Sequence, residues 1–164
     1  MRIRTFTPHD QARLTELTIE TFGPYYEDHF RPLVGEVVFA NQHGAWREDY
    51  HVLVAGLHDP QRHKHVAVAE TETGDGAELA GYVAWSVEPA RRNGTVTILA
   101  VADAHRRRNT GTALCEHAFA AMRRAGAEVV EIGTGGDEFH TPARALYERL
   151  GCTPLPVTVY YRVL

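Results

Sequence analysis

The chain has 164 residues, about the size of one domain, and a formal net charge of −4 from 17 basic and 21 acidic side chains. Because charges of both signs are mixed along the chain, the composition gives no electrostatic footprint for nucleic acid or an anionic membrane. The two cysteines are too few for a disulfide framework, and no apolar run is long enough to span a membrane. We therefore expect one domain over residues 1–164, located in the cytoplasm, with no nucleic-acid or membrane partner.

The first third of the chain is predicted to be one strand followed by helices. Residues 2–7 alternate as a strand does, and Thr7 followed by proline is typical of a capped helix start. Gly23-Pro24 predicts the end of that helix. Hydrophobic spacing predicts two further helices, one over 30–38 and one over 46–57.

Three histidines, His58, His63 and His65, follow these helices. Their spacing matches no common metal-ligand pattern, no cysteine is near, and Pro60 indicates a solvated turn. We therefore expect no metal site.

An antiparallel meander is predicted next. Strands at 66–71 and 79–87 are joined by a hairpin loop at 72–77, and a third strand covers 95–101. A helix between this third strand and a strand at 129–132 implies that those two run parallel.

The last part of the chain contains two helices with clear ends. The first begins near Thr110 and is expected to end at Gly126, and the second begins at Thr141-Pro142 and ends at Gly151. Residues 158–163 alternate and are predicted to be a terminal strand.

The turn before the helix at Thr110 has the features of an anion site. The start of a helix points free backbone N–H groups and the positive end of its dipole into the turn. Arg106–Arg108 add charge, Asn109 tolerates a left-handed conformation, and Gly111 allows a ligand to approach the backbone without a Cβ in the way. The alternative is a solvated basic loop before an ordinary surface helix.

Two motifs carry a family resemblance. The segment Arg106-Arg-Arg-Asn-Thr-Gly-Thr-Ala-Leu114 resembles the acyl-CoA pyrophosphate motif of the GNAT superfamily of N-acetyltransferases, with Asn109 where a first glycine is usual. The segment Ala143-Arg-Ala-Leu-Tyr147 resembles the family's Ala-x-x-Leu-Tyr helix, which here ends in Gly151-Cys152 instead of Gly-Phe, and His140 stands where an asparagine is common. The resemblance is strong from about Leu79 onward and weak over 23–57.

The resemblance implies an α+β fold of α/β/α layers with the element order βααβββαβαβ. It also implies a mixed central sheet of six to seven strands, with a splay between the fourth and fifth strands. A homodimer is compatible with this fold.

The resemblance also implies acetyl-CoA as the acyl donor. Leu99 and Val101 would present backbone groups to the pantetheine arm and the thioester, and His140 and Ala143 would add cofactor contacts. The pyrophosphate would rest on the turn formed by Arg106, Arg107, Arg108, Asn109, Thr110, Gly111 and Thr112.

Tyr147 matches the tyrosine that the family commonly uses to protonate the departing thiolate, and Leu99 would assist through its main chain. A phenol with a pKa of about 10 is protonated at neutral pH and can donate to a thiolate, whose pKa is about 8.5. The alternative is an aromatic residue packed in the core.

The sequence does not identify the general base, and a neutral amine would need none. The candidates are Glu131 through water, His140, Glu27, Asp28, Asp137 and Glu138.

The implied activity is transfer of an acetyl group to a primary amine of a small molecule, by direct attack in a ternary complex. Acetylation of a protein N-terminus or lysine, and a non-catalytic acyl-CoA sensor, remain alternatives.

We expect the weakly matching segment 23–57 to form the wall of the acceptor pocket, because aromatic rings and carboxylates suit an organic cation. The alternative is an ordinary buried aromatic stripe beside exposed acids. The aromatic residues are Tyr25, Tyr26, Phe30, Trp46 and Tyr50, and the acids are Glu27, Asp28, Glu36, Glu48 and Asp49.

Overall fold

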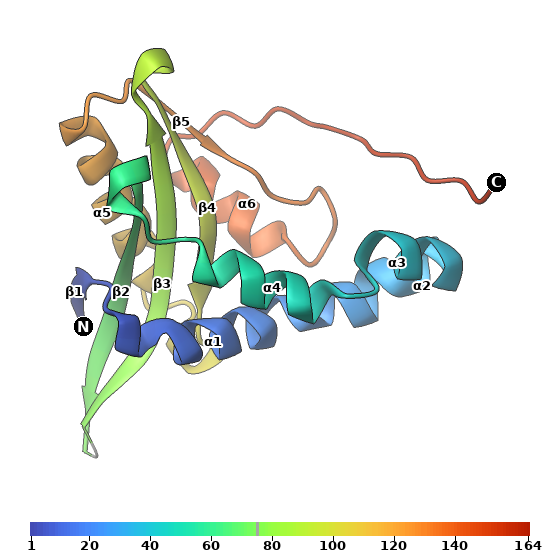
Figure 1. Cartoon of the computed structure of the whole chain (residues 1–164), viewed down its shortest axis with the longest axis horizontal. Helices are drawn as coiled ribbons and strands as arrows, with labels where there is room; N and C mark the ends of the chain where they lie inside the picture. The colour runs from blue at the N-terminus through green and yellow to red at the C-terminus, as the bar shows by residue number, and fades with distance from the viewer. Residues whose placement is uncertain (75) are drawn as a thin grey trace.

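The computed structural model describes residues 1–74 and 76–164 and has a mixed sheet with helices on both faces (Figure 1). The antiparallel meander and the parallel fifth strand are confirmed, since β1 to β4 pair antiparallel and β5 pairs with β4 in parallel. The predicted loop at 72–77 is largely strand, and Asp75 lies outside the described residues. The described strands, in their order across the sheet, are β1 (Arg2–Thr5), β2 (Lys64–Thr73), β3 (Gly76–Glu88), β4 (Asn93–Val101) and β5 (Val129–Ile132).

Helices α1 and α4 pack together on one face of the sheet, and α5 covers the other face, with α6 beside it (Figure 1). No helix in the described part of the chain is long and apolar enough to cross a membrane. The helices are α1 (Gln11–Pro24), η2 (Tyr25–Phe30), α2 (Arg31–Val34), α3 (Glu36–His43), α4 (Trp46–Ala55), α5 (Thr110–Arg124) and α6 (Thr141–Arg149), with short 3₁₀ turns η1 (Pro8–Asp10), η3 (Pro60–Arg62), η4 (Pro89–Arg91) and η5 (Asp103–His105).

The sheet separates two hydrophobic cores. Alternate residues of β2 point to opposite faces, so Val66 and Val68 pack with α1 and α4, and Ala67 packs with α5. Leu14 and Leu17 anchor α1 in the first core, and Leu114 and Met122 are among the α5 residues that fill the second. Both faces of the central strands are therefore buried, which explains their nearly continuous apolar sequences.

The start of the first helix is confirmed at Thr7-Pro8, with one 3₁₀ turn before α1. The Thr7 backbone N–H donates to Asp10 Oδ2 at 2.7 Å, and Arg4 donates to both Asp10 oxygens at 2.8 and 2.7 Å. The hydrogen bonds from Arg4 and then from Thr7 lower the pKa of Asp10 to about 2, against the opposing effect of burial. This partly buried ion pair links β1 to the start of α1.

The α-helix α1 ends at Pro24, as predicted, but the chain does not turn there. Pro24 is the last residue of α1, and the chain continues into the π-helix η2 and then α2. The wider i→i+5 pattern of a π-helix accommodates a proline that has no N–H to donate. Gly23 is needed for packing instead, because a Cβ there would lie 3.0 Å from Trp46 Cη2. The helix predicted over 30–38 is broken at Gly35, which has φ +79°.

The terminal strand predicted at 158–163 is also absent, so the described sheet has five strands where six to seven were expected. Gly151 ends α6 with φ +83°, as predicted, and the chain beyond it is extended and runs away from the sheet (Figure 1). Pro154 and Pro156 hold the residues before them in extended conformations, which carries the segment past the sheet edge of its own chain.

Candidate active site

Strands β4 and β5 are paired over only part of their length. The paired residues run from Asn93 and Val129 to Val96 and Ile132, and β4 then continues alone to its end at Val101. This pairing agrees with the predicted splay between the two strands.

A β-bulge lies where this pairing ends. On the β3 side, Ala84 pairs with Ile98 and Trp85 with Val96, so Thr97 has no residue opposite it. Such a bulge bends a strand and increases its twist locally, and here it coincides with the point where β4 separates from β5.

A cavity of about 230 Å³ lies in the gap between the two strands. Its walls come from the separated part of β4, the end of β5, the helix α6, and the helices that cover the first core. The lining residues are Phe22, Tyr25, Tyr26, Tyr50, Leu53, Val96, Thr97, Ile98, Leu99, Ile132, Gly133, Thr134, His140, Ala143 and Tyr147.

Four of the site residues predicted from sequence meet in this cavity: Leu99, His140, Ala143 and Tyr147. Phe22, Leu53 and Thr97 also line it but were not predicted. Phe22 and Leu53 have the periodicity of ordinary core residues, and the bulge at Thr97 depends on pairing with β3, so no local signal identifies them.

Tyr147 is a neutral phenol in this setting. Burial raises its pKa well above the ordinary value, and the nearby thiols of Cys115 and Cys152 raise it further. Both cysteines are free. Tyr147 therefore carries its proton throughout the neutral pH range, as a general acid for a departing thiolate must.

His140 forms a close pair with Asp137. Its Nδ1 lies 2.7 Å from Asp137 Oδ2, and its backbone N–H donates to Asp137 Oδ1 at 3.2 Å. Burial alone would raise the pKa of Asp137, but the hydrogen bond and charge of His140 outweigh it and lower that pKa. Arg144 fixes the loop by donating to the carbonyls of Gly135 and Asp137, both at 2.6 Å. A Cβ at Gly135 would collide with both side chains of the pair.

The predicted anion site lies at the start of α5, which begins at Thr110 as expected. Asn109 has φ +62° in the left-handed region, and no side chain caps the helix, so its first backbone N–H groups have no acceptor within the helix or from a cap. Arg107 and Arg108 are exposed and form no ion pair with the described residues. These features fit a bound pyrophosphate.

Two of the predicted cofactor residues have contacts of their own at this turn. Arg106 Nε donates to the Val101 carbonyl at 3.1 Å, and its guanidinium pairs with Asp103. Arg106 therefore stabilises the turn itself, and the Val101 carbonyl already has a donor.

Gly111 packs closely against its neighbours. A Cβ there would lie 3.2 Å from Leu146 Cδ2 and 3.8 Å from Leu99 Cδ2 and Val101 Cγ2. The missing side chain faces the protein interior, so glycine allows α5 to approach α6 and β4 closely. The geometry thus gives this glycine a packing role, and the expectation that it also clears space for a ligand stays a prediction.

The acceptor wall predicted from 23–57 is only partly present. Tyr25, Tyr26 and Tyr50 line the cavity, and the Tyr26 and Tyr50 hydroxyls lie 3.2 Å apart. Burial, and then the hydrogen bond with Tyr26, raise the pKa of Tyr50. Phe30 and Trp46 belong to a separate aromatic cluster that includes Tyr26 and Tyr50 at its border.

The carboxylates proposed for that wall do not line the cavity. Glu27 accepts from Trp46 Nε1 at 3.0 Å and pairs with Arg31 at 2.9 Å, and Glu36 also pairs with Arg31. The spacing of four residues along the helix brings Arg31 within reach of Glu27. Glu36 is on the next helix, α3, and its pair with Arg31 spans the break at Gly35. Asp28, Glu48 and Asp49 are likewise outside the lining.

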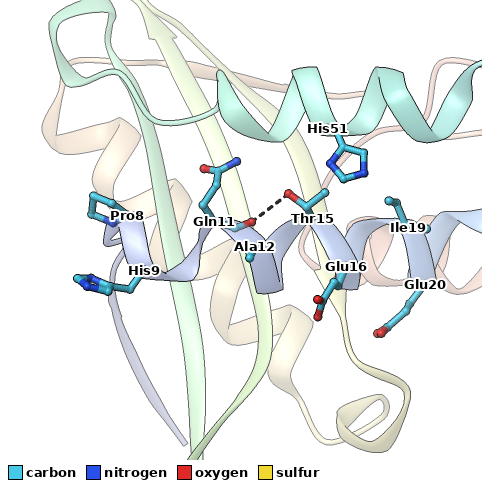
Figure 2. A pocket seen from close by; sticks show the side chains of 9 residues that line it. All are labelled: Pro8, His9, Gln11, Ala12, Thr15, Glu16, Ile19, Glu20 and His51. Atoms are coloured by element: carbon cyan, nitrogen blue, oxygen red, sulfur yellow. Dashed lines mark hydrogen bonds between the residues drawn. The ribbon is translucent and has the colours of Figure 1, made fainter.

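A second hollow of about 710 Å³ lies between α1 and α4, on residues shown in Figure 2. It is larger because it is a more open groove, and it shares no residue with the cavity between β4 and β5. Two of its polar side chains have partners nearby, since the Thr15 hydroxyl donates to the Gln11 carbonyl at 2.9 Å and Glu20 pairs with Arg13. None of the site residues predicted from the sequence lines this groove, so we place the candidate active site between β4 and β5.

Comparison with known proteins identifies the family to which the chain belongs. The model of the Acetyltransferase (GNAT) family matches residues 13–152, which is most of the chain. The chain therefore belongs to the GNAT family of acetyltransferases.

A curated relative matches only part of the chain. Mycothiol acetyltransferase from Beutenbergia cavernae is 35% identical over 92 residues, which cover 56% of this chain and 30% of that protein. The chain thus matches less than a third of the length of this curated relative.

Solved structures show the same fold over the whole chain. A variant of the BH1408 protein from Bacillus halodurans has a TM-score of 0.69 at 17% identity, and the match covers 100% of both chains. An aminoglycoside acetyltransferase from an uncultured soil metagenomic sample has a TM-score of 0.61 at 23% identity, covering 99% of this chain and 98% of that one. At these identities the likeness is one of fold alone.

Proposed function

We propose that the protein transfers an acetyl group from acetyl-CoA to a primary amine of a small molecule. The observation that carries this proposal is the cavity between β4 and β5, where Tyr147, Leu99 and His140 meet. The names of two similar proteins, a mycothiol acetyltransferase and an aminoglycoside acetyltransferase, support a small-molecule acceptor.

The donor site extends from the start of α5 into the gap. The free N–H groups of Thr110, Gly111 and Thr112, with Arg107 and Arg108, hold the pyrophosphate. The main chain of β4 near Leu99 has no strand partner on the β5 side and is free to bind the pantetheine arm. When bound, acetyl-CoA supplies an acetyl group activated as a thioester.

His140 acts as the general base. Because Nδ1 is held by the Asp137 carboxylate, the neutral ring carries its proton on Nδ1 and leaves Nε2 free to accept one. The amine nitrogen bonds to the acetyl carbon, its proton passes to Nε2, the carbon–sulfur bond breaks, and Tyr147 protonates the sulfur. Asp137 stabilises the imidazolium that forms.

The cavity selects for a compact amine that binds uncharged. Its lining is mostly aromatic and aliphatic, and its polar side-chain groups are tyrosine and threonine hydroxyls and the His140 ring, with no carboxylate, so a buried ammonium would be poorly solvated. An amine that enters the cavity already neutral avoids that cost and leaves His140 able to accept the proton released on attack.

Thiol release from acetyl-CoA, measured across aminoglycosides, polyamines, amino acids and peptides, tests the activity. We expect turnover with at least one small amine and little with peptides. Preferred turnover of peptides would support the protein-acetylating alternative. Acetyl-CoA binding by calorimetry without turnover on any amine would support the sensor alternative, and either result would overturn the proposal.

The role of His140 is tested by the kcat/KM of variants at neutral pH. His140→Gln should lose about 100-fold to 10,000-fold in kcat/KM, with acetyl-CoA affinity unchanged. Asp137→Asn should give a smaller loss. His51→Gln, at an exposed histidine in the groove of Figure 2, is the matched control and should behave as wild type. Unchanged kcat/KM in His140→Gln would remove this residue from the mechanism.

A further inference from the structure

The part of the cavity that α1, η2 and α4 supply is mainly aromatic. Leu99 and Tyr147, which the proposed function assigns to the donor side, belong to β4 and α6 instead. The aromatic part is therefore left for the acceptor. Its lining residues are Phe22, Tyr25, Tyr26, Tyr50 and Leu53.

The aromatic rings adjoin the proposed base. The Tyr25 ring meets the His140 imidazole edge-on, with 4.8 Å between the ring centroids. Phe22 and Tyr50 stack at 5.7 Å, and the Tyr26 ring meets Tyr50 edge-on at 6.0 Å. Aromatic rings prefer stacked and edge-on contacts with centroids about 4.5–7 Å apart. A flat ring of a substrate can join this group through the same contacts, with its amine beside His140.

The size of the cavity limits the acceptor to one ring. Its volume of about 230 Å³ is below the roughly 300–1,000 Å³ typical of pockets for drug-sized ligands, and the acetyl thioester also needs part of it. A sugar ring carries several hydroxyls, and each would need a partner in a lining that is mostly apolar. An aromatic ring buries its faces against the surrounding rings without that cost.

Tyr26 and Tyr50, the phenol pair, leave one hydrogen-bond donor for a ligand. Their hydroxyls lie 3.2 Å apart, and the bond between them uses one of the two O–H donors. Neither hydroxyl has another hydrogen-bond partner in the described part of the chain, so one O–H remains free. Burial, and then the hydrogen bond with Tyr26, raise the pKa of Tyr50, so this phenol keeps its proton at neutral pH. The free donor suits an oxygen atom on the ligand.

We propose that the acceptor is a primary amine carried on a single aromatic ring, with an oxygen atom at the end of the ring remote from the amine. This inference rests on the proposed function and narrows its substrate class. The amine nitrogen lies beside His140, the ring packs among the tyrosines, and the oxygen accepts the free O–H of the phenol pair. The lining contains no carboxylate that would favour a polyamine instead.

Kinetics with a graded set of amines test the substrate class on the unaltered protein. The set is tyramine, phenethylamine, cyclohexylethylamine, glucosamine and putrescine, with thiol release from acetyl-CoA as the signal. We expect tyramine to have the highest kcat/KM. Loss of the oxygen in phenethylamine should lower kcat/KM by about 3-fold to 10-fold. Loss of aromaticity in cyclohexylethylamine should lower it by a further factor of about 2 to 10, and glucosamine and putrescine should be poor substrates.

The outcomes of this experiment separate the inference from the proposed function. A higher kcat/KM for glucosamine, putrescine or cyclohexylethylamine than for tyramine would overturn the inference and leave the proposed function standing. Equal values for tyramine and phenethylamine would do the same. No turnover of any amine would overturn both.

Removal of the two hydroxyls of the phenol pair tests the contact with the oxygen. Tyr26→Phe/Tyr50→Phe keeps both rings, and the ratio of kcat/KM for tyramine to that for phenethylamine should fall to about 1. Because the ratio is measured within one protein, a general loss of stability affects both substrates alike and does not change it. Tyr160→Phe, at an exposed tyrosine near the end of the chain, is the control and should keep the wild-type ratio. A wild-type ratio in the double variant would overturn the inference.

Discussion

Tyr147, the general acid of the proposed reaction, gives the first prediction at the scale of single residues. Its hydroxyl has no hydrogen-bond partner among the described residues, so Tyr147→Phe leaves no buried group unpaired. We expect kcat to fall by about 100-fold to 10,000-fold, while donor affinity and melting temperature stay the same. Steady-state kinetics, calorimetry and thermal unfolding measure these quantities. Tyr160→Phe, in the exposed tail, is the control, and unchanged turnover in Tyr147→Phe would mean that the tyrosine only packs.

Asp10 gives a stability prediction with a definite pH dependence. Its pKa is lowered from 3.8 to about 2 in the folded protein. The stabilisation is therefore fully present above about pH 4 and is lost as the pH falls toward 2. Asp10→Asn should cost about 2 kcal/mol at pH 7 and less as the pH falls below 4.

Urea unfolding from pH 7 to pH 3 measures this difference. Asp103→Asn, at an exposed carboxylate, should change the free energy of unfolding by less than about 0.5 kcal/mol. If Asp10→Asn changed the free energy of unfolding at pH 7 as little as Asp103→Asn does, the ion pair with Arg4 would contribute nothing to stability.

At the scale of elements, the contact between α5 and α6 depends on Gly111. A valine there would press on Leu146, Leu99 and Val101, and overpacking of this kind costs about 1–3 kcal/mol. We expect Gly111→Val to lower the melting temperature and to weaken donor binding through displacement of α6. Thr112→Val places the same side chain one residue further on and should have little effect on either. A Gly111→Val protein with normal stability and impaired donor binding would support the interpretation that this glycine makes room for a ligand.

The elements that sequence predicted well have local signals. Thr141-Pro142, Gly126 and Gly151 each act on the helix end beside them, and the structure has helix ends at these points. Asn109 was likewise expected in the left-handed region because its own side chain tolerates it.

The predictions that failed required knowledge of distant partners. Gly23-Pro24 has the local signal of a helix end, and α1 does end at Pro24, but the sequence did not predict that the chain continues directly into the π-helix η2. The segment 158–163 has the local pattern of a strand, but it pairs with no strand in the described part of the chain. Glu27 has the charge expected of a substrate contact, but its carboxylate already accepts hydrogen bonds from Arg31 and Trp46.

The whole molecule has a third hydrophobic cluster outside the two cores of the sheet. Phe30, Phe39 and Trp46 form its centre, and Tyr50 is the side chain that it shares with the core beneath α1 and α4. In Figure 1, α2 and α3 extend beyond the sheet. Their packing against the rest of the protein therefore depends mainly on this one cluster.

Such a region should open without global unfolding. We expect amide hydrogens of α3 to exchange with solvent at a lower free energy of opening than those of β3, which lies in the centre of the sheet. Tyr50→Ala should lower the free energy of opening of α3 further. Leu53→Ala, three residues along α4, is the control variant and should leave it unchanged. Native-state hydrogen exchange measures both, and equal protection of α3 and β3 would show that the two unfold as one unit. Because Tyr25 and Tyr26 join this region to the cavity, the same opening would set how fast a bulky acceptor enters and leaves.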